Sequence, residues 1–576
     1  MVTYLSMLEK LIFLYGEEKG KETANKLEKI INEAKVKIDC EDRLFWDEKD
    51  VFLITYADSF RDMDSRFRGN DRRSSNNRRN GNDNNGTLKT LSKFLDVHLK
   101  NVLNGVHILP FYPYSSDRGF SIIDYYQVKK EFGTWGDIEE ISKKYRLMAD
   151  LVLNHVSIKH DWFQRFLAGD PKYENYFIWF EEDKIPWDDL KKVIRSRVTP
   201  LVTPFETKKG RRFVWTTYSV GNFTDQVDLN YQNPEVLLEI LKVILNLLEK
   251  GVRIFRLDGV SGIWKQIGTT CRHLPQTHTI LKLFREIMNE VCPSAFIITE
   301  TTTASFAENI SYFGNTQDEA QVVYNFPLAP LILQAFYSRS SKHLTDWQRN
   351  MTQLSPKNSL FNILDIHDGI NIHAVKSLLS DSEVQSIFKE VGEHGGQFSY
   401  RTGPDGQKTV KEMHVTWWSA INRKDDEPFD LQLRKFLTSR AIAMSIRGIP
   451  AIYYLSLFGR ENDIAACEKT KHGRDINRTN LSFSEISEAL SNRQSRDAKV
   501  FHSLLDLINL RKQFKAFHPN ARQEVLSLDE RIFAVLRGEG DERILALHNV
   551  SGEKVDVKFE EKNFSLEPYG FIWVEV

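Results

Sequence analysis

Val252-Arg-Ile-Phe-Arg-Leu-Asp258 and Ala295-Phe-Ile-Ile-Thr-Glu300 are short apolar runs that each end in a carboxylate. A third run, Leu360-Phe-Asn-Ile-Leu-Asp-Ile-His-Asp368, ends in a His-Asp pair. Apolar runs that stop at an acid, with helical stretches between them, are typical of parallel strands that present side chains at one face of a barrel. An aspartate and a glutamate in such positions can serve as nucleophile and acid/base at a glycosidic bond.

Further strand-like runs continue this pattern on both sides of the first three. They are Val51–Tyr56, Val106–Phe111, Leu147–Leu153, Gln321–Phe326 and Ala451–Leu455, which brings the total to eight. Eight alternations of strand and helix predict an α/β fold, the TIM (β/α)8 barrel, whose active site lies at the C-terminal ends of the strands.

Two gaps between the predicted strands are longer than an ordinary connection and predict inserted subdomains after strands 3 and 7. The second gap contains the turn-forming string Arg401-Thr-Gly-Pro-Asp-Gly406. Alternating runs near the end of the chain predict a small C-terminal antiparallel β domain. The expected organisation is an N-terminal helical extension (1–48), the first part of the barrel (49–156), an inserted subdomain (157–232), the middle of the barrel (233–369), a loop subdomain over the cleft (370–430), the last part of the barrel (431–520) and the C-terminal β domain (521–576).

Composition excludes some classes of partner. The 576 residues carry a net charge of −1, so the chain as a whole has no electrostatic attraction for nucleic acid or a membrane surface. No run of apolar residues is long enough to span a bilayer, and the N-terminus has the pattern of an amphipathic helix rather than a signal peptide. The four scattered cysteines lack metal-ligand spacing, so we expect reduced thiols in a cytoplasmic protein. The sequence leaves open whether the chain is a monomer or a homodimer.

The segment 61–86 differs from everything around it, because it is rich in Arg and Asn and has almost nothing to bury. We expect a disordered loop there. An arginine-rich contact to phosphate or RNA is the functional interpretation, and a passive insertion is the one that the composition favours. Its Ser-Arg-Phe-Arg-Gly-Asn-Asp string resembles translated palindromic repeats of bacterial genomes.

Four blocks in order along the chain resemble the α-amylase superfamily of retaining glycoside enzymes. They are Asp150-Leu-Val-Leu-Asn-His155, Arg256-Leu-Asp258, Glu300 within Thr-Glu-Thr, and His367-Asp368. A single Arg-x-Asp triplet carries little information, whereas four blocks that each end a predicted barrel strand are specific. The resemblance covers about residues 50–576.

Within the superfamily the chain is most similar to the sucrose phosphorylase branch. The supporting strings include Val106–Tyr125, Leu201–Phe205, Asn309–Gly314 and Gly473–Arg478. The run Trp264–His278 most resembles the glucosylglycerate phosphorylases of that branch. Those enzymes cleave 2-O-α-glucosyl-glycerate with inorganic phosphate, which is a co-substrate, and need no cofactor.

The resemblance assigns three catalytic carboxylates. Asp258 would be the nucleophile that forms a β-glucosyl ester, and Glu300 the acid/base. Asp368 would stabilise the oxocarbenium-like transition state. Arg256 lies two residues before Asp258 on the same strand face and would keep that carboxylate ionised.

Five further residues are implied contacts of the glucosyl unit. Asp58 and Arg474 resemble the pair that holds the far edge of the glucose, and His107 matches a contact to a sugar hydroxyl. His155 and His367 would donate hydrogen bonds beside Asp368, although a histidine in a buried strand also suits a purely structural role.

The acceptor side has weaker signals. Lys159 occupies roughly the place of a basic acceptor-site residue, where it would hold phosphate or the glycerate carboxylate, and a solvated surface lysine is the alternative. Glu412 and His414 are candidates for the border of that site. Asn154 binds calcium in many amylases, but this branch generally dispenses with the ion, so we predict no metal.

The chain departs from the family pattern at three places. Gly259 replaces the usual Ala after the nucleophile, Thr302–Ala307 replaces the usual residues after Glu300, and Asp365-Ile precedes His367. These changes keep the acids but alter the acceptor side. The implied function is a retaining phosphorylase acting on glucosylglycerate. The alternatives are a sucrose or sucrose 6-phosphate phosphorylase, an α-glucosidase or transglucosidase with the same acids, and an inactive binding protein on the same barrel.

Overall fold

The computed structural model describes residues 2–40, 45–62, 86–195, 199–220, 223–301, 305–351, 354–402, 408–424 and 426–576. Most of the Arg- and Asn-rich segment 61–86 lies outside these residues, as do the first half of Thr302–Ala307 and most of the turn-forming string that begins at Arg401. The prediction of a disordered insert therefore stays a prediction.

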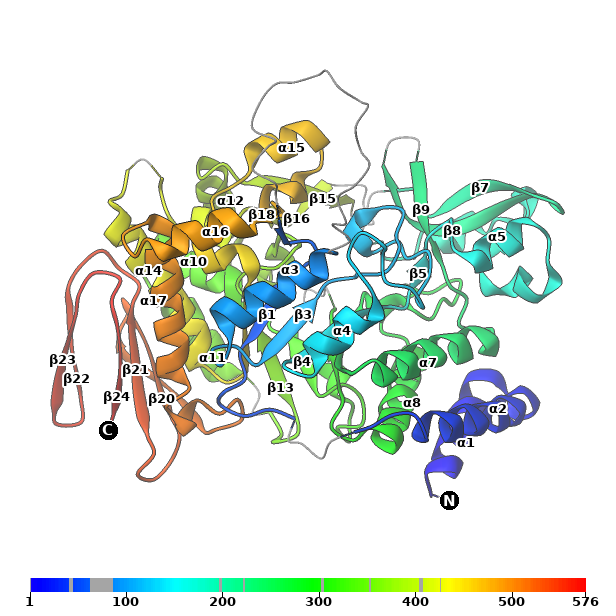
Figure 1. Ribbon diagram of the computed structural model, residues 1–576, viewed down its shortest axis with the longest axis horizontal. Coiled ribbons are helices and arrows are strands. Elements are labelled where there is room, and N and C mark those ends of the chain that lie inside the picture. Colours follow the sequence, from blue (N-terminus) through cyan, green and yellow to red (C-terminus); the bar gives the residue numbers. More distant parts are fainter. Residues whose placement is uncertain are drawn as a thin grey trace, which may run out of the picture.

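Eight parallel strands close into a barrel, which confirms the predicted fold (Figure 1). The first strand closes the ring by pairing with the eighth, and the others pair in chain order. The strands are β1 (Phe52–Thr55), β3 (Gly105–Ile108), β4 (Arg146–Val152), β10 (Val252–Asp258), β11 (Phe296–Thr299), β12 (Val322–Tyr324), β13 (Ser359–Asn362) and β17 (Ile449–Tyr453).

The strands are apolar almost throughout because both of their faces are covered. Every residue of β4 and β11 is buried, and β10 is buried except at Arg253 and Asp258. Helices pack around the barrel, among them α7 (Pro234–Glu249) and α8 (Pro275–Val291). Each of these two begins with proline, which suits the first helical position because its missing N–H needs no partner there.

The long connection from β4 to β10 forms an antiparallel sheet at the C-terminal end of the barrel. It includes β5 (His155–Val156), β8 (Gly210–Val220) and β9 (Phe223–Asp228), with β5 pairing to β9. That pairing sets His155 opposite Asp228. The connection therefore places the carboxylate of Asp228 close to the end of β4, the third barrel strand.

The connection from β13 to β17 also builds a small sheet. It contains β14 (Ile370–Asn371), β15 (Gln397–Thr402) and β16 (Lys408–His414), and the helix α12 (Asp381–Glu393) precedes β15. Asn371 pairs with Glu412, so this sheet carries Glu412 towards the loop that follows β13.

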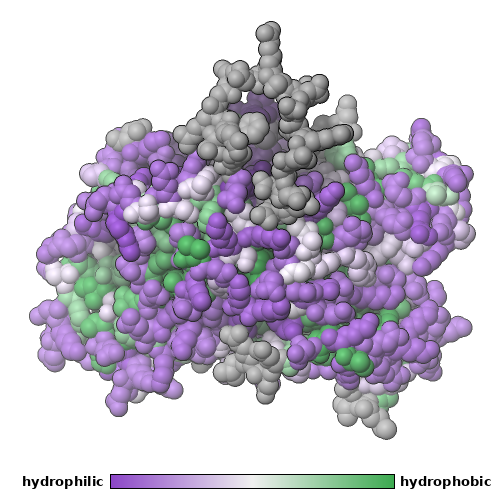
Figure 2. All heavy atoms as spheres, in the orientation of Figure 1, coloured by the Kyte–Doolittle hydropathy of each residue, from purple (hydrophilic) through white to green (hydrophobic). Residues whose placement is uncertain are grey.

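Six strands near the C-terminus form the predicted antiparallel structure, at the left of Figure 1. A four-stranded sheet contains β19 (Gln523–Asp529), β20 (Ile532–Arg537), β21 (Ile544–Asn549) and β24 (Phe571–Glu575), and the hairpin of β22 (Val555–Phe559) and β23 (Lys562–Leu566) lies beside it. No helix in the described part of the chain is long and apolar enough to cross a membrane. Hydrophilic residues cover most of the face seen in Figure 2.

The N-terminal helices α1 (Val2–Tyr15) and α2 (Glu17–Lys35) pack on the outside of the barrel against α8 and α7 (Figure 1). Tyr15 donates a hydrogen bond of 3.1 Å to the carbonyl of Tyr231, and Lys10 pairs with Glu286 at 2.9 Å. The extension is therefore fixed to the helical layer by polar contacts as well as by apolar ones.

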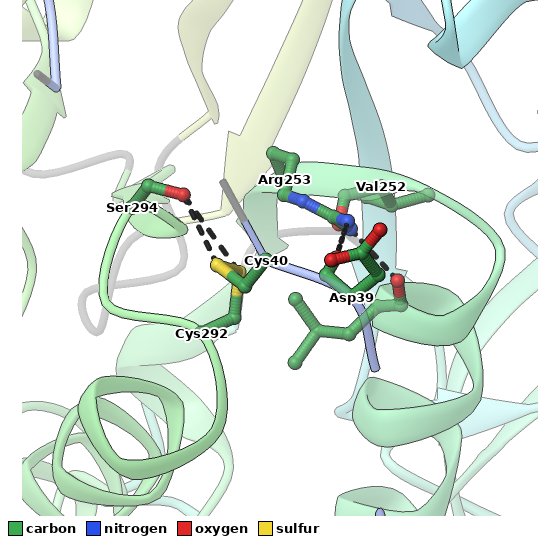
Figure 3. Close-up of a disulfide and its surroundings, with 7 residues drawn as sticks. Asp39, Cys40, Val252, Arg253, Cys292 and Ser294 are labelled. Atoms are coloured by element: carbon green, nitrogen blue, oxygen red, sulfur yellow. Dashed lines mark hydrogen bonds between the residues drawn. A yellow bond between two sulfur atoms is a disulfide. The ribbon is translucent and has the colours of Figure 1, made fainter. Parts of the chain in front are cut away.

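A disulfide also joins the extension to the barrel, and it corrects the expectation of four reduced thiols. Cys40 follows α2 and bonds to Cys292, the residue directly after α8 (Figure 3). The two cysteines are 252 positions apart, so no spacing in the sequence could pair them. Packing of the extension on α8 brings their Cα atoms to 5.3 Å, within the usual range for a disulfide. Cys271 and Cys467 are buried free thiols.

Removing this crosslink should destabilise the folded protein, because a crosslink between distant residues restricts the unfolded chain. We expect the Cys40→Ser/Cys292→Ser double variant to lose about 2–4 kcal/mol of unfolding free energy and a few degrees in thermal midpoint. A thiol titration of the denatured, non-reduced protein should count the two free cysteines. Four reactive thiols, with equal midpoints for both proteins, would contradict the disulfide.

Candidate active site

Asp258, Glu300 and Asp368 line one cavity at the C-terminal end of the barrel. Asp258 is the last residue of β10, and Glu300 directly follows β11. The two strands are neighbours with Leu257 opposite Thr299, so the next residue of each strand emerges beside the other. Adjacent barrel strands thus bring together two carboxyl groups that are 42 positions apart (300 − 258) in the chain.

Gly259 connects the two carboxyl groups. Gly259 directly follows Asp258, and its backbone N–H donates a hydrogen bond of 2.9 Å to Oε2 of Glu300. The φ of Gly259 is +55°, in the left-handed region that glycine adopts at little cost. The exchange of the family's alanine for glycine therefore suits the backbone conformation at this turn.

Arg256 is a buried guanidinium that holds Asp258. Its Nη1 donates to Oδ1 of Asp258 at 2.8 Å and to Oδ1 of Asp150 at 2.5 Å. Asp150 in turn accepts a bond of 2.7 Å from Nε2 of His107. His107 is itself 1% exposed and does not line the cavity, so it acts on Asp258 only through Asp150 and Arg256.

The surroundings separate the acid–base properties of the two carboxyl groups. Burial raises the pKa of Glu300 to about 7, and the neighbouring Asp258 adds to the rise. Burial also raises the pKa of Asp258, but there the ion pair with Arg256 opposes it. Arg256 bonds to Asp258 directly and to Glu300 not at all, so its charge favours the ionised form of Asp258 more strongly than that of Glu300.

Asp368 is held by cations on the opposite side of the cavity. Arg474 Nη1 lies 2.6 Å from its Oδ1, and Arg478 Nη2 lies 3.6 Å from the same oxygen. Burial alone would raise the pKa of Asp368, but these guanidinium groups hold it well below its usual range. Arg474 also bonds Glu412 through Nη2, at 2.9 Å.

Two predicted histidines line the cavity, and one of them lies close to Asp368. His367 stacks on Phe120 with ring centroids 4.9 Å apart and places Nε2 3.5 Å from Asp368. Burial lowers the pKa of His367 to about 3, so its ring is neutral. His155 shares a hydrogen bond of 2.9 Å between its Nε2 and the carbonyl of Phe120.

Other predicted residues lie outside the cavity lining. The carboxylate of Asp58 pairs with Arg61 at 2.5 Å, whereas Arg474 pairs with Glu412. Asp58 and Arg474 therefore bond to different partners. Lys159 is exposed and does not line the cavity. His414 is buried and does not line the cavity, whereas Glu412 on the same strand does.

Four cations that we did not single out from the sequence do line the cavity: Arg195, Lys265, Arg272 and Lys411. Lys411 pairs with Glu412 at 2.8 Å. Lys265 and Arg272 belong to the run Trp264–His278 that carries the finer resemblance. The basic residues of that run were therefore the sequence signal from which these two cavity cations could have been predicted.

Lys265 binds Asn154, the residue for which the resemblance raised a calcium role. Its Nζ donates to Oδ1 of Asn154 at 2.6 Å and lies 2.9 Å from Oδ2 of Asp228. The amide and carboxylate oxygens that would suit a calcium ion thus already bind an ammonium group of the chain itself. Among the described residues, no group of three or more His, Cys, Asp or Glu side chains is placed to hold a metal.

Known proteins share this sequence and architecture. Residues 54–383 match the family model "Alpha amylase, catalytic domain". The chain is 41% identical over 579 aligned positions to a glucosylglycerate phosphorylase of Spirochaeta thermophila, covering 99% of this chain and 93% of the relative. It is 37% identical to a glucosylglycerate phosphorylase of Escherichia coli, covering 93% and 91% respectively. The crystal structure of a sucrose 6F-phosphate phosphorylase from Thermoanaerobacter thermosaccharolyticum matches with a TM-score of 0.74 and 26% identity, over 92% of this chain and 98% of that one. The chain therefore belongs to the α-amylase family and, within it, to the sucrose phosphorylase branch.

Proposed function

We propose that this protein is a retaining glycoside phosphorylase that transfers the α-glucosyl unit of glucosylglycerate to inorganic phosphate. The products are α-glucose 1-phosphate and glycerate. One observation carries the chemistry: the two carboxyl groups at the ends of β10 and β11 have different partners, with Arg256 bound to Asp258 and only the backbone N–H of Gly259 bound to Glu300. The substrate follows from the relatives that align over nearly the whole chain.

In the first step Asp258 attacks the anomeric carbon of the glucosyl unit. The bond from that carbon to the glycerate oxygen breaks, and a bond to a carboxylate oxygen of Asp258 forms. Glu300 donates its proton to the departing oxygen, so glycerate leaves as an alcohol. The pKa of Glu300 near 7 suits this donation, because the group still carries a proton at neutral pH.

In the second step phosphate enters the space that glycerate has left. Glu300, now ionised, takes a proton from the phosphate, whose oxygen attacks the anomeric carbon and displaces Asp258. Two inversions at the same carbon restore the α configuration. Phosphate is a substrate in this scheme, and the chain's own carboxyl groups do all the proton transfer.

The opposite end of the cavity holds the sugar. Asp368, kept ionised by Arg474, stabilises the positive charge that develops on the ring and accepts hydrogen bonds from sugar hydroxyls. His367 lies beside it as a neutral hydrogen-bonding group, and His155 lines the same cavity. Asp58 lies outside this set and would have to exchange Arg61 for the sugar in order to contribute.

We propose that the two insertions form side walls of the cleft. The first, 157–232, contributes Arg195 and Asp228 to the cavity, and the second, 370–430, contributes Lys411 and Glu412. The proposed compartment is the cytoplasm, where glucose 1-phosphate would stay because an anion does not cross the bilayer. The Cys40–Cys292 disulfide is a bond that is uncommon in that compartment.

The decisive experiment is a phosphorolysis assay with purified protein and glucosylglycerate. We expect α-glucose 1-phosphate, with the anomer assigned by NMR, to form only when phosphate is present. Sucrose and sucrose 6F-phosphate should serve as poor donors in the same assay. Release of free glucose at the same rate with and without phosphate would instead identify a hydrolase.

The reaction should slow on the alkaline side of neutrality. Glu300 acts on the donor in its protonated form, so kcat/KM for glucosylglycerate should fall about tenfold per pH unit above its pKa of about 7. α-Glucosyl fluoride needs no protonation to leave and should lack this decline. A rate on glucosylglycerate that stays flat to pH 9 would contradict the assignment.

The two carboxyl groups should respond differently to substitution. Glu300→Gln should lower kcat/KM on glucosylglycerate by about 10²–10⁴-fold. It should release fluoride from α-glucosyl fluoride nearly normally when azide is the acceptor, because that reaction needs neither acid nor base. Asp258→Asn should be inactive on both donors. Equal losses on both donors for Glu300→Gln would contradict an acid/base role.

A further inference from the structure

Arg272 is a cation of the cavity wall that no carboxylate of the described residues neutralises. Lys265 pairs with Asp228, and Lys411 with Glu412, whereas Arg272 has no ion pair within 4.0 Å in that part of the chain. Arg195 also lacks one there, but it is exposed to solvent and bonds to the carbonyl of Thr199. Burial lowers the pKa of its guanidinium, with Asp228 and Glu300 acting the other way. A partly buried cation without a counter-ion is costly unless a ligand supplies the anion.

The guanidinium is fixed in position by neutral acceptors. Its Nη1 donates to the hydroxyl of Ser261 at 2.9 Å, and its Nε donates to the carbonyl of Ile194 at 3.2 Å. A guanidinium has five N–H donors, so both N–H groups of Nη2 and the second of Nη1 remain for a ligand. These donors form the fork that binds a carboxylate through two parallel hydrogen bonds.

Gly262 makes room for this side chain. A Cβ added at Gly262 would lie 3.0 Å from Nη1 of Arg272 and 3.2 Å from its Cζ. The guanidinium thus packs against the bare backbone of the short 3₁₀ turn Val260–Gly262, which begins two residues after Asp258. Both residues line the cavity.

Arg272 lies on the side of the cavity from which the leaving group departs. It packs on Gly262 in the turn after Asp258, and Gly259 of the same turn donates its N–H to Glu300, the proposed proton donor to the leaving oxygen, whereas Asp368 and Arg474 define the proposed sugar end. A group attached to the leaving oxygen would therefore lie close to this guanidinium. In glucosylglycerate that group carries a carboxylate next to the glycosidic oxygen.

We propose that Arg272 is a specificity-determining residue that binds the carboxylate of glycerate, both as leaving group and as acceptor. The inference rests on the proposed function and adds a recognition element for a 2-hydroxy acid. It replaces Lys159, the cation that the sequence suggested, because Lys159 is exposed outside the cavity. Inorganic phosphate offers the same anionic chemistry and is the competing ligand.

The test runs the reaction in reverse, with glucose 1-phosphate as donor and either D-glycerate or glycerol as acceptor. The two acceptors share hydroxyl groups and differ in the carboxylate. Arg272→Gln should lower kcat/KM for glycerate by about 10–100-fold, the size of a lost charge-assisted hydrogen bond. Transfer to glycerol should change less than about threefold. Arg272→Lys should recover part of the glycerate activity, since it restores the charge but not the fork.

Controls separate the possible failures. Arg165→Gln removes an exposed arginine of α5 (Asp161–Leu167) outside the cavity and should leave the glycerate-to-glycerol ratio unchanged. Melting temperatures and fluoride release verify that each variant is folded with intact chemistry. If wild-type protein fails to transfer to glycerate, the proposed function is wrong.

A wild-type enzyme that uses glycerate, with an unchanged ratio in Arg272→Gln, overturns the role of Arg272 alone. A rise in KM for phosphate in the forward direction, with that ratio unchanged, assigns Arg272 to phosphate instead and also overturns the carboxylate assignment.

Discussion

The site depends on one buried guanidinium shared between the barrel interior and its rim. Arg256 bonds Asp150 on β4 and Asp258 at the end of β10 through the same nitrogen, Nη1. Its Nε and Nη2 have no hydrogen-bond partner in the described chain, and its guanidinium lies over the rings of Phe120 and Tyr324 at 5.7 and 5.6 Å. The aromatic faces shield the cation from water and carry no full negative charge that would neutralise it, so its charge acts mainly on the two aspartates.

Charge is distributed unevenly over the two ends of the cavity. At the sugar end the ions neutralise one another, with Arg474 between Asp368 and Glu412, and a neutral sugar enters without bringing a charge. At the other end a positive charge stays unpaired on Arg272. That is the end where an anion must leave in one half of the proposed reaction and another anion must enter in the next. An unpaired cation there attracts both ions without binding either one irreversibly.

The sequence predicted the barrel well, because each strand is a short apolar run and each run ends where the polar rim begins. It also predicted that Asp258, Glu300 and Asp368 share one site, and the closed sheet brings them into one cavity, while their catalytic roles stay a prediction. Contacts made between distant segments were beyond its reach. The Cys40–Cys292 bond depends on how the extension packs on α8. Whether Lys159 or Arg272 lines the cavity depends on the paths of the loops that carry them. Neither depends on local periodicity, which is what a single sequence reports best.

The contact between Gly262 and Arg272 has a consequence for how such an enzyme can evolve. Any side chain at position 262 competes with the guanidinium for the same few ångströms. An ancestor with a larger residue there would gain the arginine only with its guanidinium shifted from the position it holds here. Glycine at position 262 therefore favours this placement of the guanidinium, although the two positions lie ten apart in the chain. Acceptor preference would then depend on the two positions together, so substitutions at positions 262 and 272 should be non-additive.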